Sequence, residues 1–232
     1  MKKYFTSLLA AGVLLLAGCT KDNVDPPKSN LTGRVVYQDQ EVGVRTNGVQ
    51  LELWQRGYQL FTKIPIYVAQ DGTFSATLFD GNYKLVRLRD NGPWTNNTDS
   101  ISVEVRGNTV VDVPVQPYYV VRNATFTKSS SSITATCRVS QAATGRNIES
   151  VTLFMNTTQF VDTNNGVALT DPERARNTGN VLAGAALADL NRELNLSFIL
   201  PSALRGVCYV RIGVKTQGVG ELFYSPVQKI VL

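Results

Sequence analysis

Alternation of apolar and polar residues is the dominant pattern in this chain. In each alternating segment every second residue is apolar, and short turns rich in Gly, Asp and Asn separate the segments. Such a period of two places one face of a strand in a core and leaves the other in water. The pattern therefore predicts an all-β protein. The clearest strands cover residues 49–53, 74–78, 101–105, 133–139, 151–155 and 208–214.

The strands fall into two groups separated by a proline-containing hinge. Pro114 and Pro117 interrupt the alternation, and proline is poorly tolerated inside sheets. We therefore expect two β-sandwich domains in tandem, the first over residues 31–117 and the second, immunoglobulin-like, over residues 118–232.

A long segment, residues 160–191, departs from the second strand pattern. Asp171 as a cap with Pro172 at the first helical position predicts a helix start. Residues 185–190 favour a further helical turn. An insertion of this length in a compact sandwich is more often functional or mobile than structural.

Part of this segment has the spacing of a calcium-binding loop. Asp162, Asn164 and Glu173 occupy its first, third and twelfth positions, but Gly166 stands at the fifth, where a ligand belongs. We interpret the segment as a surface loop that leads into a helix, and we predict no metal site.

The N-terminus has the features of a bacterial lipoprotein signal. Lys2 and Lys3 precede a short apolar run over residues 8–16, and the sequence LAGC ends at Cys19. The alternative, a membrane-spanning helix, requires about 20 apolar residues. We therefore expect residues 1–18 to be removed and Cys19 to be lipidated.

Residues 19–30 are polar and contain two prolines, which predicts an extended tether between the lipid and the first domain. Asp22 and Asp25 resemble the surface-export signals of Bacteroidetes lipoproteins. The acyl chains would be the only contact with the membrane.

Composition excludes several kinds of chemistry. The chain has no histidine, which is the usual general base near neutral pH and the commonest metal ligand. Glycosidase chemistry needs only two carboxylates, but most acids here stand beside turn residues, where Asp bonds the nearby backbone. We predict no enzymatic activity and no cofactor. Removal of Lys2 and Lys3 leaves 21 of the 23 Lys and Arg against 18 Asp and Glu, a net charge of only +3, so nothing indicates a nucleic-acid partner.

Several spaced motifs in the first domain resemble the carboxypeptidase-regulatory, or prealbumin-like, module. That resemblance implies a seven-stranded sandwich without catalysis. The motifs are Gly33-x-Val35, Gly48-Val49-x-Leu51, Asp71-Gly72-x-Phe74 and Gly81-x-Tyr83.

The LAGC signal, the opening LTGRVVY and the later strands ITATCRVS and ESVTLFMN together resemble a Bacteroidetes lipoprotein family, domain of unknown function 3823. Members tend to be encoded beside starch-utilisation-type uptake systems, in which a TonB-dependent transporter and its lipoprotein partner import glycans. The resemblance implies a lipid-anchored, surface-exposed outer-membrane protein that assists glycan capture. No binding residues are carried over from it.

Two functions follow as alternatives. In the first, the protein binds glycan through the loop around Trp94, whose indole would stack on a sugar while Asn96, Asn97 and Asp99 bond its hydroxyls. The alternative is that Trp94 folds back over its own sandwich. In the second, the protein is a structural or assembly module that contacts a transporter complex without binding sugar. Trp54 lies on the polar face of its strand, so it either packs between the domains or is exposed.

Two cysteines remain once Cys19 is set aside. Cys137 and Cys208 each lie on the apolar face of a strand in the second domain, so both are expected to face its core. Export favours oxidation, which makes a disulfide possible. The alternative is two free buried cysteines that act as small apolar residues.

Overall fold

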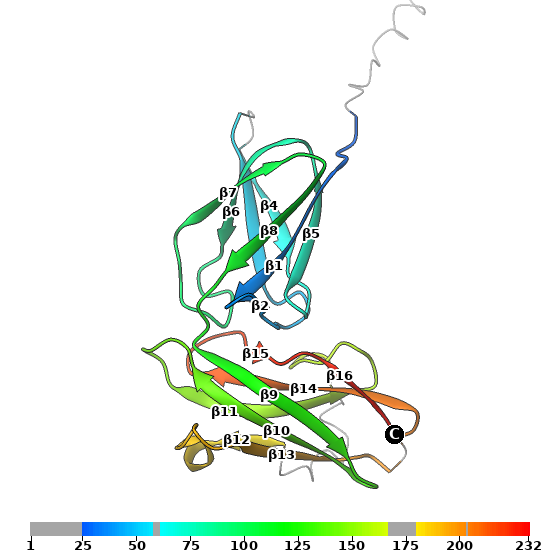
Figure 1. Ribbon diagram of the computed structural model, residues 1–232. Helices are drawn as coiled ribbons and strands as arrows, with labels where there is room; N and C mark the ends of the chain where they lie inside the picture. The colour runs from blue at the N-terminus through cyan, green and yellow to red at the C-terminus, as the bar shows by residue number, and fades with distance from the viewer. Residues whose placement is uncertain (1–24, 58–60, 167–179, 203) are drawn as a thin grey trace, which may run out of the picture.

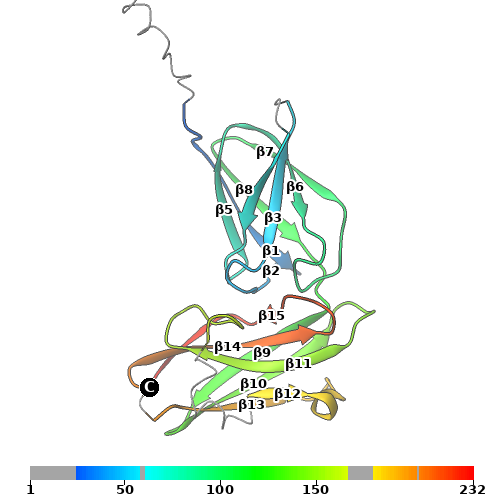
Figure 2. The ribbon, with the colours of Figure 1, turned by 180° about the vertical axis from the view of Figure 1, so that it is seen from behind.

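The protein is all-β and consists of two β-sandwiches in tandem (Figures 1 and 2). The computed structural model describes residues 25–57, 61–166, 180–202 and 204–232. The fold class predicted from the alternating pattern is therefore confirmed. Within the described residues, no helix is long and apolar enough to cross a membrane.

Some sequence predictions fall outside the described residues. They concern the signal peptide, the lipidation site Cys19 and the predicted helix start at Asp171, together with Glu173 of the calcium-like spacing. The predicted helical turn at residues 185–190 corresponds to a short 3-10 helix, η2 (Gly184–Leu187).

The first sheet of the first domain is built around β1 (Ser29–Tyr37). On one side β1 pairs antiparallel with β5 (Thr73–Leu78) and then with β2 (Gln40–Glu41). On its other side β1 pairs parallel with β8 (Asn108–Pro114).

The second sheet packs against the first and has the order β4, β3, β6, β7, all antiparallel. Its strands are β3 (Gln50–Gln55), β4 (Lys63–Tyr67), β6 (Gly81–Arg87) and β7 (Ser100–Val105).

The second domain also has two sheets. The three-stranded sheet has the order β13, β10, β9, and in the other sheet β11 lies between β12 and β14 while β15 and β16 both pair with β14. The strands are β9 (Tyr119–Lys128), β10 (Ser132–Gln141), β11 (Ile148–Asn156), β12 (Val181–Ala183), β13 (Leu194–Ile199), β14 (Val207–Thr216), β15 (Phe223–Tyr224) and β16 (Gln228–Val231).

Apolar faces of the paired sheets form a core in each domain. The core of the first domain continues into the second through Val120 of β9 and Phe223 of β15, which pack in the same cluster as Leu31 and Val35. The two sandwiches therefore share apolar contacts where they meet.

Candidate functional site

Trp94 does not form the accessible stacking surface that the sequence predicted. It lies in a loop at one end of the first sandwich, as expected, but its side chain is only 6% exposed. The indole packs on Gly92, where an added Cβ would lie 2.3 Å from the ring. Trp94 also forms a β-bridge with Pro117 of the interdomain linker. The prediction of a solvent-accessible Trp94 is wrong, because the indole packs in the apolar core of the first sandwich; the alternative, that Trp94 folds back over its own sandwich, is confirmed.

The polar residues of that loop stabilise the loop itself. Asn96 accepts a hydrogen bond from the backbone N–H of Asp90 at 2.8 Å and donates one to the Asp90 carboxylate at 2.9 Å. The side-chain oxygen of Asn97 accepts from the backbone N–H of Asp99 at 2.6 Å. With Trp94 buried, these residues do not form the sugar-stacking site that we predicted.

Cys137 and Cys208 both lie in the core of the second domain, as predicted, and each is fully buried. They are free cysteines, so the possible disulfide is not formed. Burial raises the pKa of each thiol to about 11. The two side chains therefore fill space as small apolar groups.

Asp162 is a structural residue of the domain interface. It is 1% exposed, and its carboxylate accepts hydrogen bonds from Asn164 N at 2.9 Å, from Asn165 N at 2.8 Å and, across the interface, from Thr46 N at 3.1 Å. The described residues contain no group of three acidic or cysteine side chains that could hold a metal ion.

Arg211 of β14 connects the two domains at the centre of this interface. Its side chain is fully buried, and it donates to the carbonyl oxygen of Val44 at 2.9 Å and that of Gln70 at 3.3 Å, both in the first domain. It also donates to the carbonyl of Val161 in its own domain. The guanidinium lies 3.8 Å from the centre of the Tyr224 ring. Burial lowers the pKa of Arg211 to about 10, so it remains charged at neutral pH.

Further contacts hold the interface around Arg211. Arg45 of the first domain forms an ion pair with the buried carboxylate of Glu221 in the second. The backbone N–H of Tyr224 donates to the carbonyl of Gly43 at 3.0 Å. An added Cβ on Gly43 would lie 2.5 Å from the backbone carbonyl oxygen of Tyr224, so only glycine permits the two backbones to approach this closely. These contacts fix the two sandwiches relative to each other.

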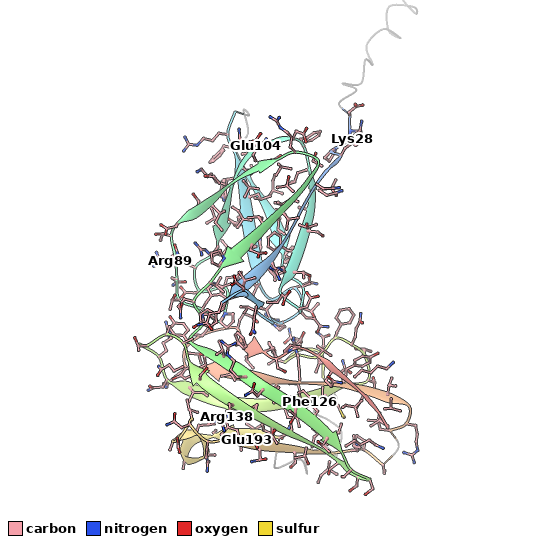
Figure 3. The ribbon with its side chains drawn as sticks, in the orientation of Figure 1. Lys28, Arg89, Glu104, Phe126, Arg138 and Glu193 are labelled. Atoms are coloured by element: carbon pink, nitrogen blue, oxygen red, sulfur yellow. The ribbon has the colours of Figure 1, made fainter. Side chains whose placement is uncertain are left out.

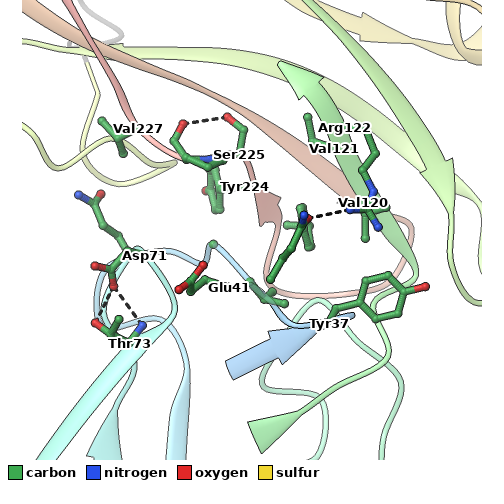
Figure 4. A pocket seen from close by; sticks show the side chains of 16 residues that line it. Tyr37, Glu41, Asp71, Thr73, Val120, Val121, Arg122, Tyr224, Ser225 and Val227 are labelled. Atoms are coloured by element: carbon green, nitrogen blue, oxygen red, sulfur yellow. Dashed lines mark hydrogen bonds between the residues drawn. The ribbon is translucent and has the colours of Figure 1, made fainter. Parts of the chain in front are cut away.

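A cleft of about 650 Å³ opens beside this interface (Figure 4). Strands from both domains line it: the β1–β2 hairpin and the turn before β5 from the first, and β9 and β15 from the second. Its volume lies within the range of small-ligand sites. We call it the interdomain cleft, and its side-chain lining includes Tyr37, Gln40, Glu41, Gln70, Asp71, Thr73, Arg122, Phe223, Tyr224 and Ser225.

One side of the cleft is formed by Tyr37 and Arg122. Gln38 and Asp39 both have positive φ, of 52° and 62°, which is the geometry of a two-residue hairpin turn. That turn brings Gln38 and Gln40 against Arg122, which donates to each amide oxygen at 2.8 Å. The guanidinium lies 6.0 Å from the centre of the Tyr37 ring, so an aromatic face and a cation adjoin each other in the cleft.

The other side of the cleft carries acidic and hydroxyl groups. Asp71 accepts from the Thr73 hydroxyl at 2.7 Å and from its backbone N–H at 3.0 Å. Glu41 forms an ion pair with Arg34 at 2.9 Å. A hydrogen bond from its own backbone, followed by the contact with Arg34, lowers the pKa of Glu41. Glu41 is thus held as a carboxylate and is unsuited to act as a general acid.

The arrangement can bind a polar ligand that has an apolar face. An aromatic ring, a guanidinium, amides, hydroxyls and carboxylates surround a concave space with a partly apolar wall. Sequence reasoning missed this site because its residues come from both domains. Asp71 was interpreted only as a turn residue, and no local pattern distinguished Tyr37 or Arg122.

Family models match nearly all of the described chain. The model of the DUF3823 N-terminal domain, from a family of proteins of unknown function, matches residues 29–116. The model of a second domain of unknown function, DUF3823_C, matches residues 119–229. Among curated proteins none matches the chain.

Several solved structures are similar over the whole of their own chains. A DUF3823 family protein from Bacteroides ovatus is 35% identical with a TM-score of 0.76, and one from Parabacteroides merdae is 33% identical with a TM-score of 0.77. A Bacteroides uniformis protein, described as a candidate carbohydrate binding protein, is 21% identical with a TM-score of 0.72. Each covers 89% of the present chain and 100% of its own.

Proposed function

For this chain, which belongs to the DUF3823 family of unknown function, we propose the role of a non-catalytic, lipid-anchored outer-membrane protein. In this proposal it binds carbohydrate in the interdomain cleft and assists glycan uptake. The observation that carries the proposal is the cleft of about 650 Å³ in which Tyr37 and Arg122 adjoin. Lipidation would occur at Cys19.

The chemistry of the cleft suits a sugar. A pyranose ring presents C–H groups on its face, which pack on an aromatic ring, and hydroxyls at its edge, which need donors and acceptors. Tyr37 offers the ring. Gln40, Asp71 and Thr73 offer polar groups of both kinds.

The rigidity of the site also favours binding. Arg122 is already bonded to Gln38 and Gln40, and the domains are held by Arg211 and by the Arg45–Glu221 ion pair. A preformed site loses less conformational entropy when the ligand binds. The candidate carbohydrate binding protein from Bacteroides uniformis shares this fold. By our proposal the protein partners would be a TonB-dependent transporter and its lipoprotein partner.

The test is a screen of residues 29–232 against oligosaccharides and polysaccharides, followed by calorimetry on any ligand found. We expect Tyr37→Ala and Arg122→Ala to weaken binding by about tenfold or more, which corresponds to about 1.4 kcal/mol. Tyr67→Ala and Arg205→Ala are matched controls, because both side chains are exposed and neither lines the cleft.

The same experiments separate the alternative function. Absence of carbohydrate binding, together with copurification of an outer-membrane transporter, would favour an assembly module. Lipidation is tested by labelling with a palmitate analogue: the parent should be labelled and Cys19→Ala should not.

A further inference from the structure

The tether enters the first domain at the end opposite the second domain (Figure 1). Ser29, the first residue of β1, donates its hydroxyl to Asp80 in the β5–β6 turn and accepts from Gly107 N in the β7–β8 turn at 2.9 Å. Lys28 and Glu104 both lie at this end (Figure 3). The start of β1 and these two turns are therefore joined.

The β3–β4 hairpin reaches the same end. Gln55, the last residue of β3, lies against Gly81, the first residue of β6, where an added Cβ would be 2.4 Å from the Gln55 amide nitrogen. We call this end, made of Ser29, the β5–β6 and β7–β8 turns and the described residues of the β3–β4 hairpin, the anchor end.

Exposed aromatic side chains gather at the anchor end. Phe61 of the hairpin is 53% exposed and Phe79 of the β5–β6 turn is 44% exposed. The Phe61 ring lies 5.0 Å from the ring of Trp54, which is partly buried. The indole N–H donates to the buried Glu52 carboxylate at 3.1 Å, which orients the tryptophan. Neither expectation for Trp54 describes this position fully: it is partly exposed, and it lies far from the domain interface.

Cationic side chains accompany these rings. On the outer face of the sheet, Trp54 pairs across the strands with Lys63 on one side and Lys84 on the other. Lys63 is bound to Glu52 at 2.7 Å. Arg56 and Lys84 form no ion pair within the part of the chain that the structure describes.

Exposed aromatic rings next to cations suit the surface of a lipid bilayer. Trp and Phe side chains on the apolar face of a membrane-bound element insert at the boundary between headgroups and acyl chains, and cations are attracted to anionic headgroups. Lys and Arg place their apolar stems along the rings and their charges in water. The same combination on the anchor end fits an anionic membrane.

The length of the tether makes such a contact frequent. Ten residue steps separate Cys19 from Ser29, so the chain between them spans at most about 35 Å. A short linker gives an effective concentration in the millimolar range. Even a weakly attractive surface is then occupied for much of the time.

We propose that the anchor end rests on the membrane, with Phe61 and Phe79 at the lipid–water boundary and Arg56 and Lys84 toward anionic headgroups. This inference rests on the proposed lipidation of Cys19. It adds an orientation: the first domain lies against the membrane, and the second domain and the interdomain cleft point away from it.

The experiment uses the full mature lipidated chain in vesicles of phosphatidylcholine and phosphatidylglycerol at a ratio of about 3:1. The chain has two tryptophans: Trp54 pairs with Lys84 of β6 near the anchor end, and Trp94 forms a β-bridge with Pro117 of the interdomain linker, at the opposite end of the first domain. Lipids brominated near the headgroup end of the acyl chains quench an indole that approaches the bilayer. The emission of Trp54 is obtained as the difference between the emission of the parent and that of Trp54→Phe. The variant Trp94→Phe measures the same emission directly, because Trp54 is then the remaining tryptophan.

We expect brominated lipid to reduce the emission of Trp54 and to leave that of Trp94 unchanged. The double variant Phe61→Ser, Phe79→Ser should lose this quenching. Phe160→Ser should retain it, because Phe160 is as exposed as Phe79 but lies in the second domain. Replacing phosphatidylglycerol by phosphatidylcholine should weaken the quenching.

Two results would overturn the inference while leaving the anchor intact: vesicles that carry the protein without quenching Trp54, or quenching that the phenylalanine substitutions leave unchanged. A change in Trp54 emission caused by soluble oligosaccharide, without quenching by lipid, would also overturn it and indicate a sugar site instead. Protein that fails to float with vesicles would refute the lipid anchor itself.

Discussion

Replacing Arg211 by methionine should uncouple the two domains. Arg211→Met keeps a long side chain with an apolar stem but removes the N–H donors that bond the carbonyls of Val44, Gln70 and Val161. Hydrogen bonds from a charged donor contribute about 1.5–3 kcal/mol each, and a desolvated cation–π contact contributes about 2 kcal/mol.

Part of this stabilisation is offset by the cost of burying the charge. Burial lowers the pKa of Arg211 well below its ordinary value, to about 10, and a pKa unit corresponds to about 1.4 kcal/mol, so burial costs on the order of 3 kcal/mol. The three hydrogen bonds and the cation–π contact together contribute about 6–11 kcal/mol, so after the cost of burial the balance predicts a net loss of about 3–8 kcal/mol in the free energy of unfolding. Because two of the three carbonyls belong to the first domain, most of this loss should fall on the coupling between domains.

The protein contains a separate probe for each domain. Both tryptophans lie in the first domain, whereas Cys137 and Cys208 are buried in the second. In urea, tryptophan emission and thiol alkylation should report a single coincident transition for the parent. For Arg211→Met the two midpoints should separate.

The matched control is Arg138→Met, because Arg138 is exposed and, among the residues that the structure describes, donates only to the carbonyl of Asn191 at 3.3 Å. Its transitions should remain coincident. Arg211→Met with coincident transitions at the parental midpoint would refute the role that we assign to Arg211.

Three further predictions concern the tryptophans and the two buried cysteines. Trp94→Ala should lower the free energy of unfolding by about 3–5 kcal/mol, and Trp54→Ala by less, because Trp94 is 6% exposed whereas Trp54 is partly exposed; equal losses in urea denaturation would contradict this. Denatured but unreduced protein should be alkylated at both Cys137 and Cys208, and mass spectrometry that finds a disulfide would contradict the free thiols. Thiols that ionise near pH 9.0 when unfolded and near pH 11 when folded release protons on unfolding between these values, so stability should fall as pH rises through this window, by about 1.4 kcal/mol per pH unit for each thiol. A double variant Cys137→Ala, Cys208→Ala with the same alkaline decline would show that other groups cause it.

Alternation predicted the strands well because it is a local consequence of burying one face of a sheet. Cys137 and Cys208 were placed in the core for the same reason. Trp94 shows the limit of this reasoning. Its neighbours Gly92 and Pro93 correctly predicted a loop, but no local pattern reveals that the indole packs in the core or that Trp94 forms a β-bridge with Pro117 of the linker.

The interdomain cleft lay beyond sequence reasoning for a related reason. Most of the first domain separates Tyr37 from Arg122 along the sequence. The two side chains meet because Gln38 and Asp39 form a hairpin turn with left-handed backbone geometry, which the sequence does not announce with a glycine. Arg211 lies within an apolar strand pattern, and only the docked first domain supplies two of its carbonyl partners.

The most direct test of the proposed function is a crystal structure of the protein with an oligosaccharide found in the screen. We predict that sugar density will fill the interdomain cleft, with a ring face against Tyr37 and hydroxyls within hydrogen-bond distance of polar groups such as Asp71. An empty cleft with sugar bound elsewhere on the molecule would contradict the account.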